Sequence, residues 1–253
     1  MFSNSGAKAP VLSGVRNALR IVDAFSESSQ VLGVSEIARR LGLPKSTTSR
    51  LAATLCSEGF LALTPAGKYR LGLRLFDRGL VAVQSHDLYN SVLHVLASLR
   101  ATSGFSSHFA ILEGSRLVQI HRTTSNDIEC LGEAHASIPL HATSTGLAVL
   151  AFAEPQLLRE TLSSQLPAFT DKTITSAERL QTAVSEVKQM GYACTRGEFF
   201  PGTASVAAPI LNQAGHAVAA LTLVALTHQM TESAEARSKT LLLNSTRAFA
   251  ASV

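Results

Sequence analysis

The sequence predicts an α+β fold with two domains, a winged helix-turn-helix over residues 12–72 and a larger mixed domain over residues 87–253. Three observations support this prediction. Residues 1–85 hold 11 Lys and Arg against 5 Asp and Glu, whereas residues 86–253 hold 11 against 13. Helical spacing dominates the basic part until a short hairpin pattern, and strand and helix patterns alternate in the rest. Such an uneven charge is expected when only one domain contacts a polyanion.

The bulk composition is that of a folded protein. The chain has 253 residues, of which 46% are hydrophobic and 16% are charged, enough for one or two full-sized cores. No apolar run approaches the roughly 20 residues that a membrane span needs, and the first residues lack the pattern of a signal peptide. We therefore expect a cytoplasmic protein without a membrane partner.

Cys56, Cys130 and Cys194 lie far apart and share no metal-binding spacing. A disulfide framework or a zinc site would need a different pattern. We interpret the three cysteines as small apolar residues of the interior.

The first two helices are predicted from apolar spacing. Arg16–Phe25 repeats apolar residues at helical intervals, and the following SESSQ breaks the helix. Ser35 can cap a second helix, in which Arg39 and Arg40 point outward. The inner stripe of this helix would consist of Ile37, Ala38 and Leu41.

The stretch LGLPKSTTSRLAATL, residues 41–55, has the pattern of the turn and second helix of a helix-turn-helix. Gly42 can adopt the left-handed conformation that ends one helix, and Pro44 suits the first turn of the next. One side of this helix is apolar apart from Thr48, which we expect to point inward. The opposite side is small and polar, so it can approach a DNA groove closely.

The residues that we predict to contact DNA in this region are Arg39, Lys45, Ser46, Thr47, Ser49 and Arg50. Arg50 can bind guanine with two hydrogen bonds, and Lys45 adds charge for the phosphates. The alternative is an ordinary amphipathic surface helix with a solvated polar face.

A hairpin follows the three helices. In FLALTPAGKYRLG two short extended runs flank the turn Thr64–Gly67. Lys68 and Arg70 lie close to this turn, where a wing can contact the phosphate backbone or a minor groove. A pair of solvated charges is the alternative. Together with the basic charge of this region, the pattern predicts a winged helix-turn-helix that binds double-stranded DNA.

Residues 73–86 are predicted to form a linker helix. Leu73, Phe76, Leu80 and Val83 recur at helical spacing. Since one winged helix contacts only one half-site, we interpret this stripe as a dimer contact. Packing against the same chain is the alternative.

The body is predicted as strands with helices on one side. Strand patterns appear in SHFAILEG, RLVQIHRT, and residues 205–211 and 217–226, and helical patterns appear in residues 88–99, 143–153 and 176–190.

The body shows no pattern typical of a catalytic site. His121, His135 and His141 lack metal-binding spacing, and we find no nucleophile elbow and no Gly-rich phosphate loop. We interpret them as ordinary histidines and predict no catalytic residue, no metal and no cofactor. Glu198 either holds a loop amide or faces a ligand, and we favour the amide.

Several segments carry a resemblance that covers nearly the whole chain. They are VRNALRIVDAF, LGVSEIARRLGLPKSTTSRLAATLCSEGFLALTPAGKYRLG, IPLHATSTGLAVLAF, GYACTRGEFFPGTASVAAPI and GHAVAALTL. In this order and spacing they resemble the IclR family of bacterial transcriptional regulators. The resemblance implies a GAF-like fold for residues 87–253, in which an antiparallel sheet and loops enclose a pocket for a small-molecule effector.

The family's ligand-contacting positions correspond here to Ser144, Thr145, Gly146, Thr195, Ser205 and Thr222. The first three begin a helix, where main-chain amides can receive a carboxylate. The sequence departs from the family at three positions: Leu147 replaces a common lysine, Thr195 a common acidic residue, and Val224 a common hydroxyl. We therefore expect the effector pocket of this chain to be less polar than a family pocket that carries those residues.

We therefore hypothesise that the effector is a small organic acid, aromatic or medium-sized, with an apolar wall formed by Phe109, Leu140, Phe199 and Phe200. The alternative is that these residues are plain core.

The resulting expectation is a ligand-responsive regulator of catabolic genes. It would act as a homodimer, or as a tetramer built as a dimer of dimers, on a pseudo-palindromic operator. Effector binding would shift the placement of the DNA-binding heads. An enzyme-like domain fused to a DNA-binding head, and a protein-interaction module, are the alternatives. Repressor and activator are equally compatible with the sequence.

Overall fold

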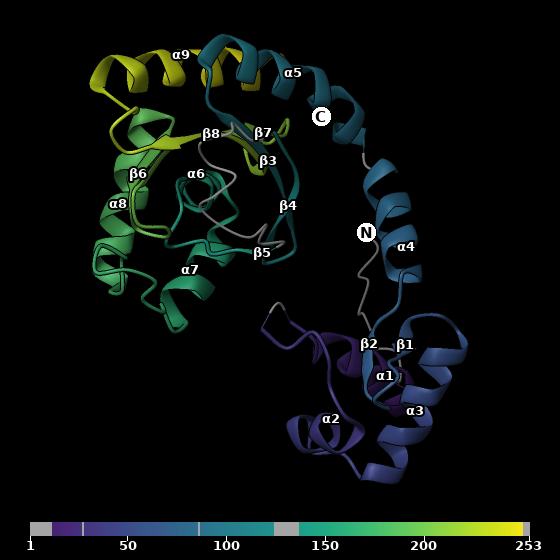
Figure 1. The fold of residues 1–253 in the computed structure, drawn as a ribbon. Coiled ribbons are helices and arrows are strands. Elements are labelled where there is room, and N and C mark those ends of the chain that lie inside the picture. The colour runs from purple at the N-terminus through teal and green to yellow at the C-terminus, as the bar shows by residue number, and fades with distance from the viewer. Residues whose placement is uncertain (1–11, 27, 86, 124–136, 250–253) are drawn as a thin grey trace, which may run out of the picture. The chain divides into compact units, whose positions relative to one another are not determined.

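The computed structural model describes residues 12–26, 28–85, 87–123 and 137–249. The chain divides into two compact units, residues 1–85 and residues 86–253 (Figure 1). The first is mostly helical and the second mixes helices with a large sheet, which confirms the predicted α+β class. In the described part of the chain, no helix is long and apolar enough to cross a membrane.

The first unit consists of α1 (Ser13–Asp23), α2 (Val34–Leu41), α3 (Lys45–Ser57), β1 (Leu61–Leu63), β2 (Tyr69–Leu71) and α4 (Arg74–Gln84). Its core gathers apolar residues from the three helices and the hairpin: Ile21, Phe25, Leu32, Ile37, Ala52 and Leu61. Leu32 also joins the hairpin through two backbone hydrogen bonds with Tyr69, of 2.8 and 2.9 Å. The wing is thereby tied to the segment that precedes α2.

The turn between α2 and α3 follows the sequence prediction in one respect and differs in two. Gly42 has φ of 65° and ends α2 in the left-handed conformation, as predicted. However, α2 begins at Val34 with Gly33 before it, so Ser35 lies inside the first turn and does not cap the helix. Pro44 stands just before α3 rather than within its first turn. The residue that precedes α2 is Gly33, two residues before the predicted cap, and α3 begins one residue later than predicted, because Gly33 and Pro44 have a non-helical backbone.

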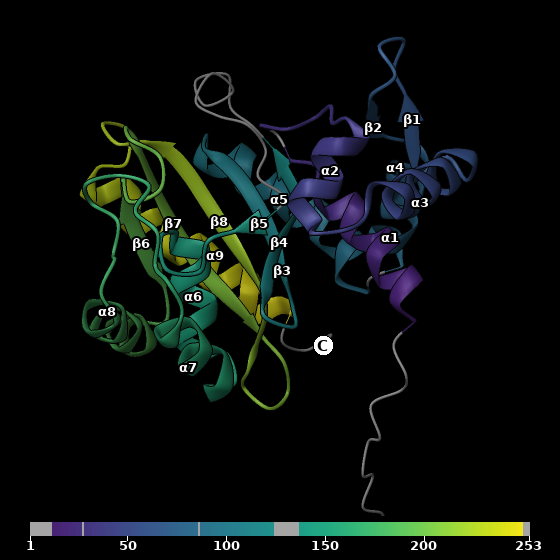
Figure 2. The ribbon, with the colours of Figure 1, turned by 90° about the horizontal axis from the view of Figure 1, so that it is seen from below.

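The second unit is built on a six-stranded antiparallel sheet with the order β5-β4-β3-β8-β7-β6. The strands are β3 (Ser106–Glu113), β4 (Arg116–Thr123), β5 (Ser137–Ile138), β6 (Ala193–Arg196), β7 (Thr203–Leu211) and β8 (Ala217–Leu226). Figure 2 shows β3 beside β4 and β8 in the middle of this sheet.

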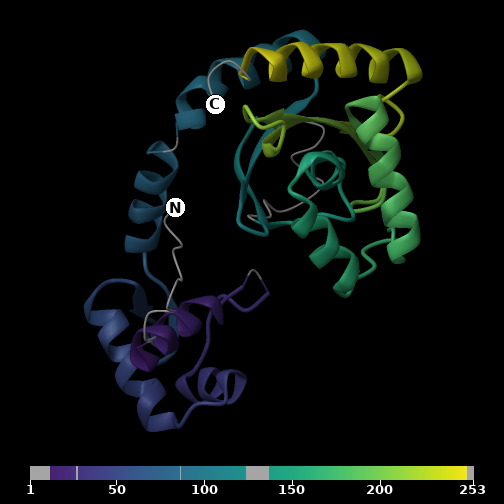
Figure 3. The ribbon, with the colours of Figure 1, turned by 180° about the vertical axis from the view of Figure 1, so that it is seen from behind.

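Helices cover both faces of the sheet, which corrects the prediction of helices on one side. Figures 1 and 3 show α5 (Asp87–Ser103) and α9 (Glu232–Phe249) along one face. The other face carries α6 (Ser144–Phe152), α7 (Pro155–Ser163) and α8 (Ala177–Met190). Two separate apolar cores result, one under α5 and α9 and one under the other three helices.

The cysteines are less buried than predicted. Cys56 and Cys194 are free and half-buried, and each packs against the edge of an apolar core. Cys56 lies in the last turn of α3 and Cys194 lies on β6 at the edge of the sheet, so only part of each side chain is covered. Cys130 lies outside the described residues.

Candidate DNA-contacting surface and effector site

The polar face of α3 is open to solvent. Lys45, Ser46, Thr47, Ser49 and Arg50 are all exposed. Small side chains precede Arg50 along this face, so a groove wall can come close to the helix backbone.

Thr48 points to the opposite side of α3, as predicted. It is fully buried, and its hydroxyl donates a hydrogen bond of 3.0 Å to the carbonyl oxygen of Pro44. A buried hydroxyl that is satisfied by the preceding turn fixes which face of α3 is left outward.

The two arginines at the end of α2 have different surroundings. Arg40 folds back on its own unit, donating to the Ala24 carbonyl at 3.2 Å, the Ser29 hydroxyl at 3.1 Å and the Glu36 carboxylate at 2.7 Å. Arg39 is exposed. Of the pair, Arg39 therefore has the side chain that is available for another molecule.

The wing has the predicted hairpin geometry. β1 and β2 are antiparallel with Leu61 opposite Leu71, and the Thr64 amide donates to the Lys68 carbonyl at 2.7 Å. Lys68 and Arg70 are exposed on this hairpin.

All five predicted cations thus lie on the surface of the first unit: Arg39, Lys45, Arg50, Lys68 and Arg70. None of them forms an ion pair with a described residue. Unpaired cations beside a hydroxyl-rich helix face are suited to phosphate oxygens and base edges.

In the second unit, the fold brings the predicted effector hydroxyls together. The hydroxyl oxygens of Ser144 and Ser205 are 2.7 Å apart, and Ser205 is also 2.7 Å from the hydroxyl of Thr195. A second pair, Thr145 and Thr222, is 2.8 Å apart. We call these five residues the hydroxyl network. It joins the first turn of α6 to β6, β7 and β8, and four of its five members are buried.

Gly146 belongs to the same turn, but its main-chain amide is not free to receive a carboxylate as predicted. Its amide donates to the hydroxyl of Thr143, the residue that caps α6, at 3.0 Å. A Cβ at this position would lie 2.3 Å from the Leu140 carbonyl oxygen, so the close approach of that loop requires glycine. Because Thr143 takes the Gly146 amide, the first-turn amides without an acceptor inside α6 are those of Ser144 and Thr145.

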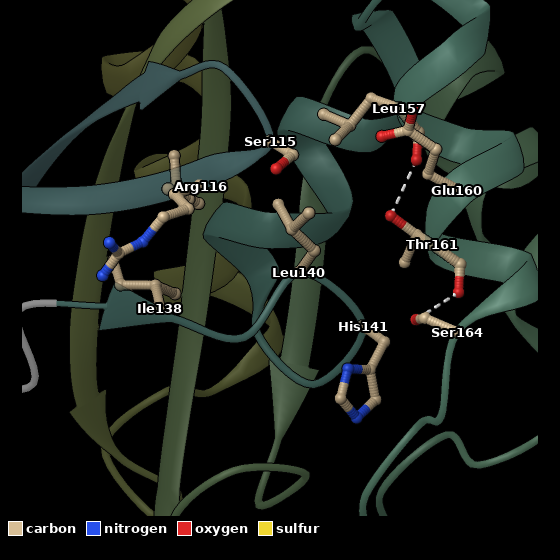
Figure 4. A pocket seen from close by; sticks show the side chains of 10 residues that line it. Ser115, Arg116, Ile138, Leu140, His141, Leu157, Glu160, Thr161 and Ser164 are labelled. Atoms are coloured by element: carbon tan, nitrogen blue, oxygen red, sulfur yellow. Dashed lines mark hydrogen bonds between the residues drawn. The ribbon is translucent and has the colours of Figure 1, made fainter. Parts of the chain in front are cut away.

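A pocket of about 330 Å³ lies beside this region, between the β3–β4 turn, β5 and α7. Figure 4 shows Arg116 and Glu160 on opposite sides of it and His141 at one end. None of the six predicted effector residues lines this pocket.

The predicted apolar wall is wrong for Phe109. Alternation along β3 places Phe109 in the core under α5 and α9, on the face of the sheet opposite α6. Phe199 and Phe200 are on loops, with ring centroids 4.4 Å apart, and Phe169 stands against Phe199 at 4.8 Å. Leu140 packs against the core under α6.

Two family matches cover most of the chain. Residues 14–65 match the IclR helix-turn-helix domain, and residues 80–251 match the family described as bacterial transcriptional regulator IclR C-terminal. The chain belongs to the IclR family.

Relatives and solved structures agree with this assignment. The HTH-type transcriptional regulator XynR of Escherichia coli (strain K12) is 32% identical, over 87% of this chain and 89% of its own length. The glycerol operon regulatory protein of Streptomyces coelicolor is 31% identical, over 81% and 82%. These relatives are named as regulators, and this IclR-family chain is accordingly a transcriptional regulator and not an enzyme.

Two crystal structures are similar over nearly their whole length. An IclR transcriptional regulator from Silicibacter sp. TM1040 has a TM-score of 0.83 at 27% identity, with 94% of each chain covered. An IclR homolog from Microbacterium hydrocarbonoxydans, complexed with 4-hydroxybenzoate, has a TM-score of 0.76 at 26% identity, with 93% of this chain and 100% of that chain covered.

Two of the three histidines considered as metal or acid-base residues, His121 and His141, have ordinary partners in this IclR-family regulator. The Nε2 atom of His141 lies 2.9 Å from the Pro167 carbonyl oxygen, and His121 packs edge-on against Tyr89 with ring centroids 6.3 Å apart. His135 lies outside the described residues. The described residues contain no group of three His, Cys, Asp or Glu that could hold a metal ion.

Glu198 holds a loop amide, as favoured from the sequence. Its carboxylate accepts a hydrogen bond from the main-chain amide of Arg196, and its own carbonyl accepts one from Thr173 at 2.6 Å. The carboxylate therefore braces the loop after β6.

Sequence reasoning missed two polar residues on the α6 face of the sheet, His108 on β3 and Arg122 on β4. They pair across the two strands, and His108 pairs on its other side with Thr222 of the hydroxyl network. A strand pattern alone does not show which residues become neighbours across the sheet.

Proposed function

We propose that this IclR-family regulator binds operator DNA through the exposed face of α3 and through the wing, and that an organic acid at the start of α6 controls it. The observation that carries the DNA part is the set of five unpaired surface cations beside the hydroxyls of α3. Arg50 would contact base edges, while Lys45, Lys68 and Arg70 would contact phosphates.

Substitution of Arg50 tests this assignment. Arg50→Ala should weaken binding to a preferred duplex by about 1 to 3 kcal/mol and relax base preference, because it removes a base contact. Lys68→Ala should weaken preferred and random duplexes alike, because it removes a phosphate contact. The measurement is fluorescence anisotropy at fixed salt, on a duplex selected from a random pool by the wild-type protein.

Arg237→Ala, an exposed arginine on α9, is the matched control and should bind as the wild type does. An equal loss on selected and random DNA for Arg50→Ala would overturn its assignment to the bases.

The effector part rests on the hydroxyl network. Its hydroxyls converge from the strands β6, β7 and β8 on the first turn of α6, where the amides of Ser144 and Thr145 lack an acceptor in the helix. The partial positive charge of a helix start favours a carboxylate there. The structural relative bound to 4-hydroxybenzoate shows that one member of the family accommodates an aromatic acid.

Calorimetric titration with 4-hydroxybenzoate, benzoate, pyruvate and glyoxylate tests the effector class. We expect an aromatic acid to bind. Binding by only the two short acids would exclude an aromatic or medium-sized effector. Ser144→Ala should weaken binding, whereas Ser163→Ala, an exposed serine at the end of α7, should not.

We also propose that α4 is a dimer contact. No residue of α4 is buried, and Leu73, Phe76, Leu80 and Val81 are exposed, Phe76 at 68%. An apolar surface of this kind on a helix is typical of an interface. Two copies would place paired heads on two half-sites, as a dimer or within a tetramer.

Sedimentation velocity tests this contact. Phe76→Lys should shift the protein toward monomer, whereas Met190→Lys, the same change at an exposed site on α8, should leave the assembly intact. An unchanged sedimentation coefficient for Phe76→Lys would exclude α4 as the contact.

The mechanism follows from linkage. An effector that binds one arrangement of the heads more tightly than another shifts the population toward it, whether the result is repression or activation. The target genes of such a sensor would be those for the use of the acid. The regulator would act in the cytoplasm, where the DNA lies.

A further inference from the structure

His108 lies in the middle of the sheet, on the face that carries α6. It stands on β3 directly opposite Thr222 of β8 and Arg122 of β4. Directly opposed residues of antiparallel strands share one face, with Cβ atoms about 5 Å apart. Ala110, two residues along the same strand, belongs to the core under α6. Figure 2 shows the three strands side by side.

The ring of His108 has an unsatisfied nitrogen. Its Nε2 atom is buried and has no hydrogen-bond partner among the described residues. Buried polar atoms without a partner are rare in folded proteins because they lose their hydration without replacement. In a sensor domain, such an atom is readily explained by a ligand that supplies the missing partner.

The ring is neutral under ordinary conditions. Burial is the main cause that lowers the pKa of His108 from 6.5 to about 4, and the nearby positive charge of Arg122 adds to it. A neutral imidazole has one donor and one acceptor nitrogen, and it offers no net charge to attract a carboxylate. A hydroxyl group suits either nitrogen because it both donates and accepts.

The hydroxyl network connects His108 to the start of α6. Thr222, the cross-strand neighbour of His108, shares a hydrogen bond of 2.8 Å with Thr145 in the first turn of that helix. Thr222 is therefore the residue that links His108 to Thr145: it lies one strand spacing, roughly 5 Å, from His108, and one hydrogen bond from Thr145. A single small molecule can reach both.

We propose that His108 is a specificity-determining residue of the effector site, whose Nε2 atom forms a hydrogen bond with an uncharged hydroxyl of the effector. The effector is then a hydroxylated organic acid, with its carboxylate at the start of α6 and its hydroxyl at His108. This inference rests on the effector site proposed above. It adds a residue, and a chemical group of the ligand, that the six predicted positions do not include.

Matched pairs of acids test the inference. Calorimetry compares 4-hydroxybenzoate with benzoate, and lactate with propionate, on the full-length wild type, His108→Phe and His108→Gln. In the pair whose carboxylate and hydroxyl match the span from the start of α6 to His108, the wild type should bind the hydroxylated member about tenfold more tightly, the usual effect of one buried hydrogen bond. His108→Phe should lose this preference while it binds the member without the hydroxyl within about threefold of the wild type. His108→Gln, which keeps a hydrogen-bonding group, should retain part of the preference.

His94→Gln, on the exposed side of α5, is the control and should behave as the wild type does. Long-range ¹H–¹⁵N spectra of the wild type give a second measurement that does not depend on a variant folding. The Nε2 resonance of His108 should move with the hydroxylated acid and stay in place with its partner.

The outcomes separate the two proposals. If acids bind but the preference survives His108→Phe, or the Nε2 resonance does not respond, the role of His108 is rejected and the effector site stands. If none of the four acids binds the wild type, the organic-acid effector itself is rejected, and the role of His108 with it.

Discussion

Lowering the pH from 7.5 to 5 should cost the second unit about 2 kcal/mol of unfolding free energy through His108 alone. In the unfolded chain the imidazole binds a proton near pH 6.5, whereas burial and Arg122 lower the folded pKa to about 4. Between these values the unfolded state holds more protons, so stability is lost as the pH falls. The loss reaches a limit of about 3 kcal/mol below pH 4, from roughly 1.4 kcal/mol per pKa unit.

Urea unfolding at pH 7.5, 6 and 5 measures this effect. The chain contains no tryptophan, so far-UV circular dichroism is the appropriate signal. Carboxylates also titrate at the lower end of this range, and the comparison that isolates His108 is wild type against His108→Gln. The variant should lose about 2 kcal/mol less than the wild type between pH 7.5 and 5.

His94→Gln should follow the wild type, because this side chain is exposed on α5. Equal losses for the wild type and His108→Gln would show that the imidazole can take up its proton in the folded protein. The explanation of the ring as a buried neutral group would then be refuted.

Two further predictions concern residues that hold the start of α6 and the helix α3 in place. Gly146→Ala should destabilise the second unit by about 1 to 3 kcal/mol, because the new Cβ meets the Leu140 backbone, which cannot rotate away. Thermal unfolding measures this loss, and an unchanged midpoint would mean that the loop moves freely. Thr48→Val should cost about 1 kcal/mol in urea unfolding, because it removes the hydrogen bond to the Pro44 carbonyl. If Thr48→Val is neutral, that bond does not hold α3 in place.

Much of the first unit can be predicted from the sequence, because its helices follow from short-range residue patterns. The outward face of α3 follows from 3.6-residue periodicity, and the end of α2 follows from Gly42, whose φ of 65° is rarely adopted by other residues. The starts of the helices were less predictable. An extended residue before α2 moves its first residue to Val34 without any side-chain cap to mark the place.

The sequences of β7 and β8 contain a signal for the layering of the second unit. β7 and β8 contain nearly continuous apolar residues, and most are buried on both faces of the sheet. A strand that faces solvent on one side alternates instead, so these runs indicate helices on both sides. The error for Phe109 has the same origin, because the face of a strand cannot be assigned until its partners are known.

The family resemblance predicts the residues of the hydroxyl network, but only the folded structure shows that they contact one another. Ser144 and Ser205 are separated by 61 residues, and Thr145 and Thr222 by 77. No local pattern relates such positions. His108 was missed because a histidine within a strand pattern carries no signal of burial, of its cross-strand neighbours or of an unsatisfied ring nitrogen.

The chain of hydroxyls from Ser144 through Ser205 to Thr195 has no fixed direction of its own. Each O–H can rotate, so every proton along the chain can point toward α6 or toward β6 while the oxygen atoms stay in place. An anion at the α6 end would turn all three protons toward itself, since each bond polarises the next. Arrival of a charge at the helix could thereby be registered at β6 as a reversal of hydrogen-bond polarity, without displacement of any heavy atom.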